Sequence, residues 1–406
     1  MKKKINIIID GNFIFHQNFA VYAGWNSTNA FPTERDEVSF IQSVANNFFS
    51  ALRQLPKGGD VIFTIDSRSW RKAVEIPNHP GYKSGRTDKD GNKGVMNPET
   101  AQKFYGLMDD FGKHLSRVGI IVSRIGGAEG DDLIYRWTKR LYDKGESCII
   151  ISGDRDLTQL VKMNKDKDKW IIQWNNKNNG KRFKNSMYVP SGWDGEWLKL
   201  GGATSIFNFD IGSDKEDLIK LIRDQAITVE VVHPDEVIMK KILAGDDGDD
   251  VPPVWINEMP SKKDPAVMTK VRMTGKKPGV VMEQLSESYS IDKTNYMNKW
   301  DDADYMQECA GLVLRLTKDV DGMAERQIVI EAMKRNAQLV WLDEAQLPYN
   351  LIAEMDLHID TMMATNETQK HRWNRKGIFD GTRFDEDAPP TKYDPFMKMS
   401  IPDNFQ

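Results

Sequence analysis

The sequence has few of the residues that build disulfide frameworks or zinc sites. Its 406 residues include 2 Cys and 6 His. Cys148 and Cys309 are too few for a disulfide framework, and no His-x-x-x-His pair is present to complete a four-ligand zinc site with them. Such cysteine use is typical of a reducing compartment, so we expect a cytoplasmic protein.

Long apolar runs and an excess of one charge are also lacking. No run reaches the roughly 18 to 20 residues of a membrane span, and the lysines at the start precede only a short apolar stretch that Asp10 ends. We therefore expect no secretion signal and no membrane partner. With 56 Lys+Arg against 60 Asp+Glu, the net charge is -4, so any nucleic-acid surface must come from local clustering.

The apolar residues of the sequence follow the pattern of a folded α/β protein. The chain is long enough for two or three domains, and 39% of its residues are hydrophobic. Short apolar runs alternate with amphipathic stretches, which predicts a mostly parallel sheet with helices on both faces. The predicted strands are 5–9, 61–65, 120–122 and 148–151, and the helical patterns include 38–55 and 133–141.

Acidic residues follow each of these predicted strands. They are Asp10, Asp66, Glu129 and Asp154. Because the carboxyl ends of parallel strands gather at one edge of a sheet, the sequence predicts a pocket of carboxylates there. For Asp10 and Asp66, ordinary turn chemistry is the alternative.

The acids also occur in crowded groups. Glu129, Asp131 and Asp132 open a predicted helix, two acids lie at 154 and 156, and four lie within 246–250. Helix capping explains one or two acids of a group, but crowded carboxylates repel one another unless a cation compensates, which favours divalent metal. A calcium loop is the alternative for 246–250, although the EF-hand spacing and its closing glutamate are missing.

Five motifs, in order along the chain, resemble those of the 5′-nuclease superfamily. They are Asp10, Asp66, Glu129-x-Asp131-Asp132, Ser152-Gly153-Asp154-x-Asp156-Leu157-x-Gln159-Leu160 and Gly245-Asp246-x-x-Asp249. The superfamily includes flap endonucleases, the 5′-nuclease domain of bacterial DNA polymerase I and T-even phage ribonuclease H. The pattern is most similar to the last of these, which implies a phage protein in the host cytoplasm.

The resemblance implies a site for two Mg²⁺ (or Mn²⁺) ions that activate water and stabilise displacement at phosphorus. Its implied ligands are Asp10, Asp66, Glu129 and Asp131 toward the first ion, Asp132, Asp154, Asp156 and Asp249 toward the second ion or the outer shell, and Asp246 in the same set.

A basic segment follows the second acid. Trp70-Arg71-Lys72 and Gly81-Tyr82-Lys83-Ser84-Gly85-Arg86 resemble the family's Arg…Tyr-Lys-x-x-Arg segment, and residues 67–90 hold six Lys/Arg against three acids. The resemblance implies that Lys83 and Arg86 are catalytic residues on the scissile phosphate, that Arg71 and Tyr82 bind nucleic acid, and that 84–117 form a helical arch. A solvated loop with Tyr82 as a packing residue is the alternative.

In the family, the motif at 245–250 starts a helix-turn-helix element that grips duplex DNA with a potassium ion. Here Asp250 stands where Asn is common, and Val251-Pro252-Pro253 leads into a longer insertion, so K⁺ is doubtful. We predict a modified helix-turn-helix element at about 238–290. The basic residues predicted to contact phosphate there are Lys262, Lys263, Lys270, Arg272, Lys276 and Lys277.

The chain is expected to divide into a nuclease domain (1–200), a helical DNA-binding domain (201–380) and an irregular tail (381–406). Residues 161–184, with eight Lys/Arg and two Asp, predict a basic hairpin beyond the sheet. The aromatic residues of the tail suit docking on a sliding clamp or single-strand-binding protein, or a tail that covers the protein's own surface, which is the simpler alternative. We expect a monomer.

These patterns predict a divalent-metal-dependent 5′-to-3′ exonuclease or flap endonuclease that cuts near the 5′ ends of DNA or RNA–DNA duplexes. Removal of RNA primers in phage DNA replication is the implied role. Two alternatives are a catalytically silent structure-specific DNA-binding replication factor and a PIN-type ribonuclease. The intact acid set argues against the first, and a PIN-type enzyme needs neither the Tyr82-Lys83 segment nor the motif at 245–250.

Overall fold

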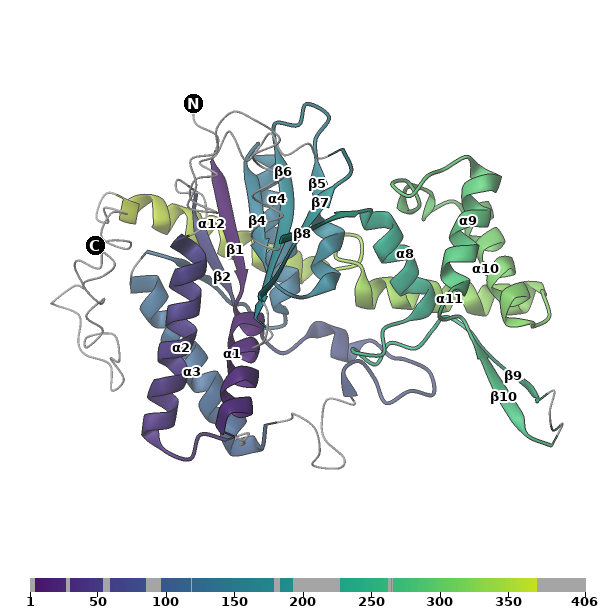
Figure 1. Cartoon of the computed structure of the whole chain (residues 1–406). Coiled ribbons are helices and arrows are strands. Elements are labelled where there is room, and N and C mark those ends of the chain that lie inside the picture. Colours follow the sequence, from purple (N-terminus) through teal and green to yellow (C-terminus); the bar gives the residue numbers. More distant parts are fainter. Residues whose placement is uncertain are drawn as a thin grey trace.

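The computed structural model describes residues 4–26, 30–53, 59–84, 96–117, 119–178, 183–192, 227–261, 264 and 266–370. An α/β body built on one sheet lies beside a helical lobe, from which a two-stranded ribbon projects (Figure 1). The predicted α/β fold with a mostly parallel central sheet is confirmed.

The central sheet has the strand order β3-β2-β1-β4-β6-β7-β8, with β5 paired to β6. Five strands run parallel, namely β1 (Ile5–Asp10), β2 (Val61–Thr64), β3 (Ile121–Ser123), β4 (Ser147–Ile151) and β6 (Trp170–Asn178). The short β5 (Lys162–Met163) and β7 (Phe183–Pro190) pair antiparallel with β6, and β8 (Ile227–Val232) runs parallel to β7. All four predicted strands are therefore present, within about a residue of their predicted ends.

Alternation along β1 builds a core on each face of the sheet. Ile7 and Ile9 join one apolar cluster, and Ile8 joins another, because successive side chains of a strand point to opposite faces. The first cluster includes α1 (Gly11–Asn26), α2 (Glu34–Arg53) and α3 (Pro98–Arg117); the second includes α4 (Gly130–Asp143) and α12 (Tyr349–Lys370). Figure 1 shows these helices around the sheet.

The expected basic hairpin at 161–184 does not lie beyond the sheet. Its strands, β6 and the start of β7, belong to the sheet itself, and Trp170 and Trp174 are each 4% exposed within the first cluster. Because these aromatic side chains pack in the core, the segment is part of the sheet although many lysines flank them. The turn at 179–182 lies outside the described residues.

The expected arch is wrong for residues 98–117. This segment is α3, whose apolar stripe, including Phe104 and Phe111, packs with α1 and α2 against the sheet. The stripe is buried because its spacing follows the helical period. The remainder of the predicted arch, 85–95 with Arg86, lies outside the described residues.

Two segments after residue 200 return to the α/β body. Strand β8 extends the sheet, and α12 packs against α4, where Arg136 forms ion pairs with Asp356 and Glu344. The predicted boundary near 200 lies in 193–226, outside the described residues, as does the tail after 370. The domain limits stay a prediction.

Among the described residues, four helices form a helical lobe around a separate apolar core. They are α8 (Pro234–Ala244), α9 (Lys277–Tyr289), α10 (Ala303–Thr317) and α11 (Met323–Val340). Between α8 and α9 stands an antiparallel ribbon of β9 (Ile256–Pro260) and β10 (Met268–Arg272) in place of a short turn, so the helix-turn-helix element is not confirmed. Short 3₁₀ helices span Trp70–Ala73, Arg155–Leu160 and Met297–Lys299. In the described part of the chain, no helix has the length and apolarity to cross a membrane.

Candidate active site

Asp10 closes β1 and caps the helix that follows. Its Oδ1 accepts the backbone N–H of Phe13 at 2.9 Å, and its Oδ2 accepts the Ser152 hydroxyl at 2.7 Å. The next residue must be glycine, since a Cβ on Gly11 would lie 2.5 Å from the Thr64 carbonyl oxygen. Asp10 is thus fixed at the carboxyl edge of the sheet, where the sequence predicts it.

Asp66 lies at the same edge, after β2. Its Oδ1 accepts the Gly130 N–H at 2.5 Å, and its Oδ2 accepts the Asn12 amide at 2.7 Å. A Cβ on Gly130 would come within 2.7 Å of that Oδ1. The glycine between Glu129 and Asp131 therefore lets the first turn of α4 approach the Asp66 carboxylate.

Asp131 and Asp154 complete a group of four acids with Asp10 and Asp66. Burial and then the charges of Asp154, Asp10 and Asp66 raise the pKa of Asp131 well above its ordinary value. Burial, then Asp66, raises the pKa of Asp10 to about 7. Four carboxylates that repel one another at one edge of the sheet are stabilised by a cation, and hard oxygen ligands suit Mg²⁺ or Mn²⁺.

Burial of acidic side chains, together with repulsion between them, should make the metal-free protein less stable as pH rises from about 5 to about 7.5. The pKa values of Asp10 (about 7) and Asp156 (about 6) lie above their ordinary value of 3.8, so across this window the folded chain holds protons that the unfolded chain has released. Thermal unfolding in EDTA should therefore show a lower midpoint at the higher pH. Asp10→Asn should reduce the difference, and an unchanged midpoint in the parent protein would contradict the expectation.

Arg71, Glu129 and Asp132 form a buried ion cluster. Arg71 is 2% exposed and binds both oxygens of Asp132, at 3.0 and 2.7 Å, and Glu129 at 3.2 Å. Asp132, itself fully buried, also accepts the Glu129 N–H in a capping box. Arg71 is thus buried in an ion cluster, which argues against direct contact with nucleic acid, and Arg71 engages both carboxylate oxygens of Asp132.

Tyr82 and Lys83 connect Glu129 to the loop at 245–250. The Tyr82 hydroxyl lies 3.1 Å from Glu129 and 3.0 Å from Asp249, and the ring is 5% exposed. Its burial favours the packing alternative over stacking on a base. Lys83 Nζ lies 2.6 Å from Glu129 Oε1 and 3.7 Å from Asp249 Oδ2.

The backbone of Lys83 has a left-handed φ of 54°, and its N–H donates to the Asp249 carbonyl at 2.8 Å. This conformation is uncommon outside glycine and persists where surrounding contacts impose it. Burial opposes ionisation of Glu129, but Lys83 and Arg71 outweigh it and lower the pKa of Glu129. Lys83 is thereby held as a cation among the acids.

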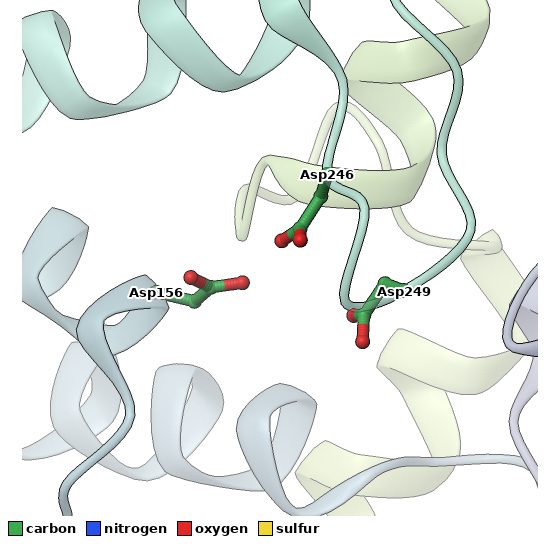
Figure 2. A group of neighbouring side chains, drawn as sticks. All are labelled: Asp156, Asp246 and Asp249. Atoms are coloured by element: carbon green, nitrogen blue, oxygen red, sulfur yellow. The ribbon is translucent and has the colours of Figure 1, made fainter. Parts of the chain in front are cut away.

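A second acidic group joins two distant motifs. Oxygens of Asp156, Asp246 and Asp249 lie within 4.8 Å of one another, and Figure 2 shows the three side chains facing a common space. Asp246 is fixed in a tight loop, where its Oδ1 accepts the Gly248 N–H at 2.9 Å and its backbone pairs with Val251. Each carboxylate can supply one ligand atom to a metal ion.

Lys241 is a residue of this group that the sequence analysis missed. Its Nζ forms ion pairs with both Asp156 and Asp246. Burial works against its charge, but the two acids raise the pKa of Lys241. The signal in the sequence was its place on α8 one helical turn before Gly245, which points its side chain toward the loop.

Lys241→Met should strengthen divalent-metal binding at this group. The Lys241 ammonium neutralises carboxylates that would hold the metal, and the substitution removes this competing positive charge. We therefore expect about tenfold tighter Mg²⁺ binding in calorimetry. Lys240→Met, on an exposed neighbour paired with Glu236, is the control. Weaker binding would instead show that Lys241 holds the carboxylates in place.

The remaining predicted residues lie on or near the ribbon. Lys270 and Arg272 are exposed on β10, and Lys276 and Lys277 lie at the start of α9. Lys262 and Lys263 lie outside the described residues. Their predicted role in nucleic-acid binding stays a prediction.

Residues 6–188 match the family model of the 5′-3′ exonuclease N-terminal resolvase-like domain. The match spans the β1, β2, α4 and β4 motifs whose acids converge at the sheet edge. The matched residues make up somewhat less than half of the chain, and they resemble this domain of the 5′-nucleases. The recognition made from the ordered acidic motifs is thus confirmed for the superfamily, while the likeness to T-even phage ribonuclease H stays a prediction.

Individual proteins similar to this 5′-nuclease domain are distant. A 5′-3′ exonuclease of Buchnera aphidicola (subspecies Schizaphis graminum) is 26% identical over 162 residues, which are 39% of this chain and 50% of the relative. The thermostable DNA polymerase I of Thermus thermophilus is 24% identical over 158 residues, 38% of this chain and 16% of that protein. The chain spans about half the length of the Buchnera exonucleases it matches.

Among solved structures, one similar protein is the bacteriophage T5 flap endonuclease, crystallised as a pseudo-enzyme–product complex with DNA and metal ions. It is 16% identical, with a TM-score of 0.47, and the match covers 90% of this chain and 100% of that one.

Proposed function

We propose that the protein is a divalent-metal-dependent 5′-to-3′ exonuclease or flap endonuclease. The observation that carries this proposal is the convergence, at one sheet edge, of acids from four separate motifs in a domain of the 5′-nuclease superfamily. A binding-only protein gains nothing from crowded carboxylates, because they repel the phosphates of its ligand.

Two groups of residues suit the metal ions. Asp10, Asp66, Asp131 and Asp154 would hold one ion, and Asp156, Asp246 and Asp249 the other. Both sets are hard oxygen donors with little competing histidine or cysteine, as Mg²⁺ and Mn²⁺ require. When bound, the ions would supply an activated water and stabilise the charge that develops on the phosphate.

The chain's own residues position the substrate around these groups. Lys83, held between Glu129 and Asp249, places a cation beside the acids, where it offsets the charge of an incoming phosphate. Tyr82 fixes Glu129 and Asp249 relative to each other through its hydroxyl. Through these contacts Tyr82 and Lys83 are held against the loop at 245–250. The acids and the Lys83 ammonium therefore keep a fixed arrangement relative to one another.

The proposed substrates are DNA and RNA–DNA duplexes with free 5′ ends or flaps, and the proposed role is removal of RNA primers in phage DNA replication. A cytoplasmic monomer that meets a sliding clamp or single-strand-binding protein belongs to the same proposal. Support for these finer points comes from the motif resemblance.

The test is cleavage of matched 5′-overhang, 5′-flap and RNA–DNA hybrid duplexes, labelled on the 5′-ended strand, with Mg²⁺ and then with EDTA. Short 5′ products that require both the metal and a free 5′ end are the expected result, and their lengths separate exonuclease from flap action. If the protein binds these substrates but cuts none with Mg²⁺ or Mn²⁺, the silent DNA-binding alternative replaces the proposal.

A further inference from the structure

The β9–β10 ribbon is firmly held at its base. Val254 and Met273, which flank the two strands, are 3% and 0% exposed in the core of the helical lobe. The Trp255 indole donates to Asp319 at 2.9 Å, and Asn257 donates its amide to the Thr317 and Lys318 carbonyls at 3.1 and 3.0 Å. These contacts fix the direction in which the ribbon projects from the lobe (Figure 1).

One face of the ribbon has no packing partner within the described residues. The strand register pairs Ile256 with Arg272, Glu258 with Lys270 and Pro260 with Met268, and all six side chains are exposed. Ile256 and Met268 are 38% and 56% exposed. An exposed face that mixes apolar and cationic side chains on a rigid support is typical of a binding surface.

The charge of the segment indicates which ligand fits this face. Residues 256–277 contain six Lys/Arg and two acids, in a chain whose net charge is -4. The Lys270–Glu258 pair is exposed on both sides, so it is weak and opens readily. In the described part of the chain, Arg272 has no carboxylate partner within ion-pair distance. A polyanion complements this charge.

We propose that the ribbon is a duplex-binding arm, whose outer face enters a groove of the double-stranded part of the nucleic-acid substrate. This inference rests on the proposed nuclease function, which supplies the substrate. Arg272 and Lys270 contact phosphates, and the Pro260–Met268 pair packs on sugars and base edges. A two-stranded ribbon fits the major groove, about 12 Å wide, and exposed Met and Pro side chains are suited to apolar contact with bases.

The test compares two variants with matched controls by fluorescence anisotropy in EDTA, which prevents metal-dependent cleavage. Lys270→Gln combined with Arg272→Gln should bind a 5′-flap duplex about tenfold more weakly and reduce the slope of log Kd against log salt by about 1.8, because two phosphate contacts are lost. Lys144→Gln combined with Lys165→Gln, at exposed sites of the α/β body, makes the same charge change and should have neither effect.

The apolar contact is tested separately. Met268→Gln should weaken duplex binding about threefold through lost apolar burial, whereas Met323→Gln, at a 71% exposed methionine of α11, should not. Binding of the corresponding single strand should change less than twofold in every variant. Circular dichroism melts check that each variant is folded.

The proposal that the ribbon binds duplex would be overturned if the ribbon variants bound duplex within twofold of the parent protein. Equal losses of affinity for single strand and duplex would overturn it as well. These outcomes are independent of the proposed nuclease function, because binding is measured without cleavage. Absence of cleavage by the parent protein with Mg²⁺ would overturn the function and leave the binding result standing.

Discussion

Asp131→Asn is expected to remove cleavage almost completely while the protein still binds its substrate. Asp131 lies among Asp10, Asp66 and Asp154, and their charges oppose its ionisation, so a cation at this edge would stabilise its carboxylate. Its loss should lower kcat by about 1,000-fold, since a metal ion contributes several kcal/mol to stabilising the transition state. Duplex affinity in EDTA should stay within a few fold, because removal of a negative charge does not weaken phosphate binding.

The measurement is single-turnover cleavage of a labelled 5′-flap duplex, with anisotropy for affinity. Asp143→Asn, the same substitution at the exposed end of the same helix, is the control and should cleave normally. The free energy of unfolding in EDTA should be equal to or above that of the parent, since a repelling charge is gone. Near-normal cleavage by Asp131→Asn would remove this residue from the site.

Asp132→Asn, one residue further along, is expected to act on stability. Asp132 is fully buried and binds Arg71 through both carboxylate oxygens, while Arg71 is only 2% exposed. Loss of the charge leaves the buried guanidinium with Glu129 as its remaining ion partner among the described residues. Breaking a buried ion pair in this way lowers the free energy of unfolding by about 3 to 5 kcal/mol.

Urea unfolding in EDTA, followed by circular dichroism, measures this cost. Asp131→Asn is the matched comparison, because it removes the same charge from the neighbouring position. A variant at 132 with parental stability but lost Mg²⁺ binding would restore Asp132 to the metal ligands, where the sequence analysis placed it. Parental stability with parental metal binding would show that Arg71 finds another partner.

The contrast between these neighbours shows how far the sequence could predict the site. The motif Glu129-x-Asp131-Asp132 identified the acids but not their directions. Consecutive residues on an α-helix point about 100° apart, so 131 faces the other strand-end acids and 132 faces Arg71. The identity of the partner on each side depends on which distant segment packs there, and Arg71 arrives from 61 residues earlier.

The fold shows a similar division. The apolar runs at β1, β2, β3 and β4 were sufficient to predict a parallel sheet, because strands buried on both faces are continuously hydrophobic. The return of β8 and α12 to the α/β body was not predicted. A strand's pairing partner and a helix's packing face are set by contacts with residues far along the chain, which leave no local periodic signal.

The sequence by itself determined the acids, their order and their place at the ends of buried strands, because strand, turn and helix start are local patterns. The tertiary structure decided which acids share a space. It placed Asp156 beside Asp246 with Lys241 between them, and it used Gln159 of the same motif to bind Val340 and Leu342, joining the α/β body to the end of α11. Such groupings depend on the packing of distant segments, since hydrogen bonds and ion pairs form only where folding brings their partners within about 3 Å.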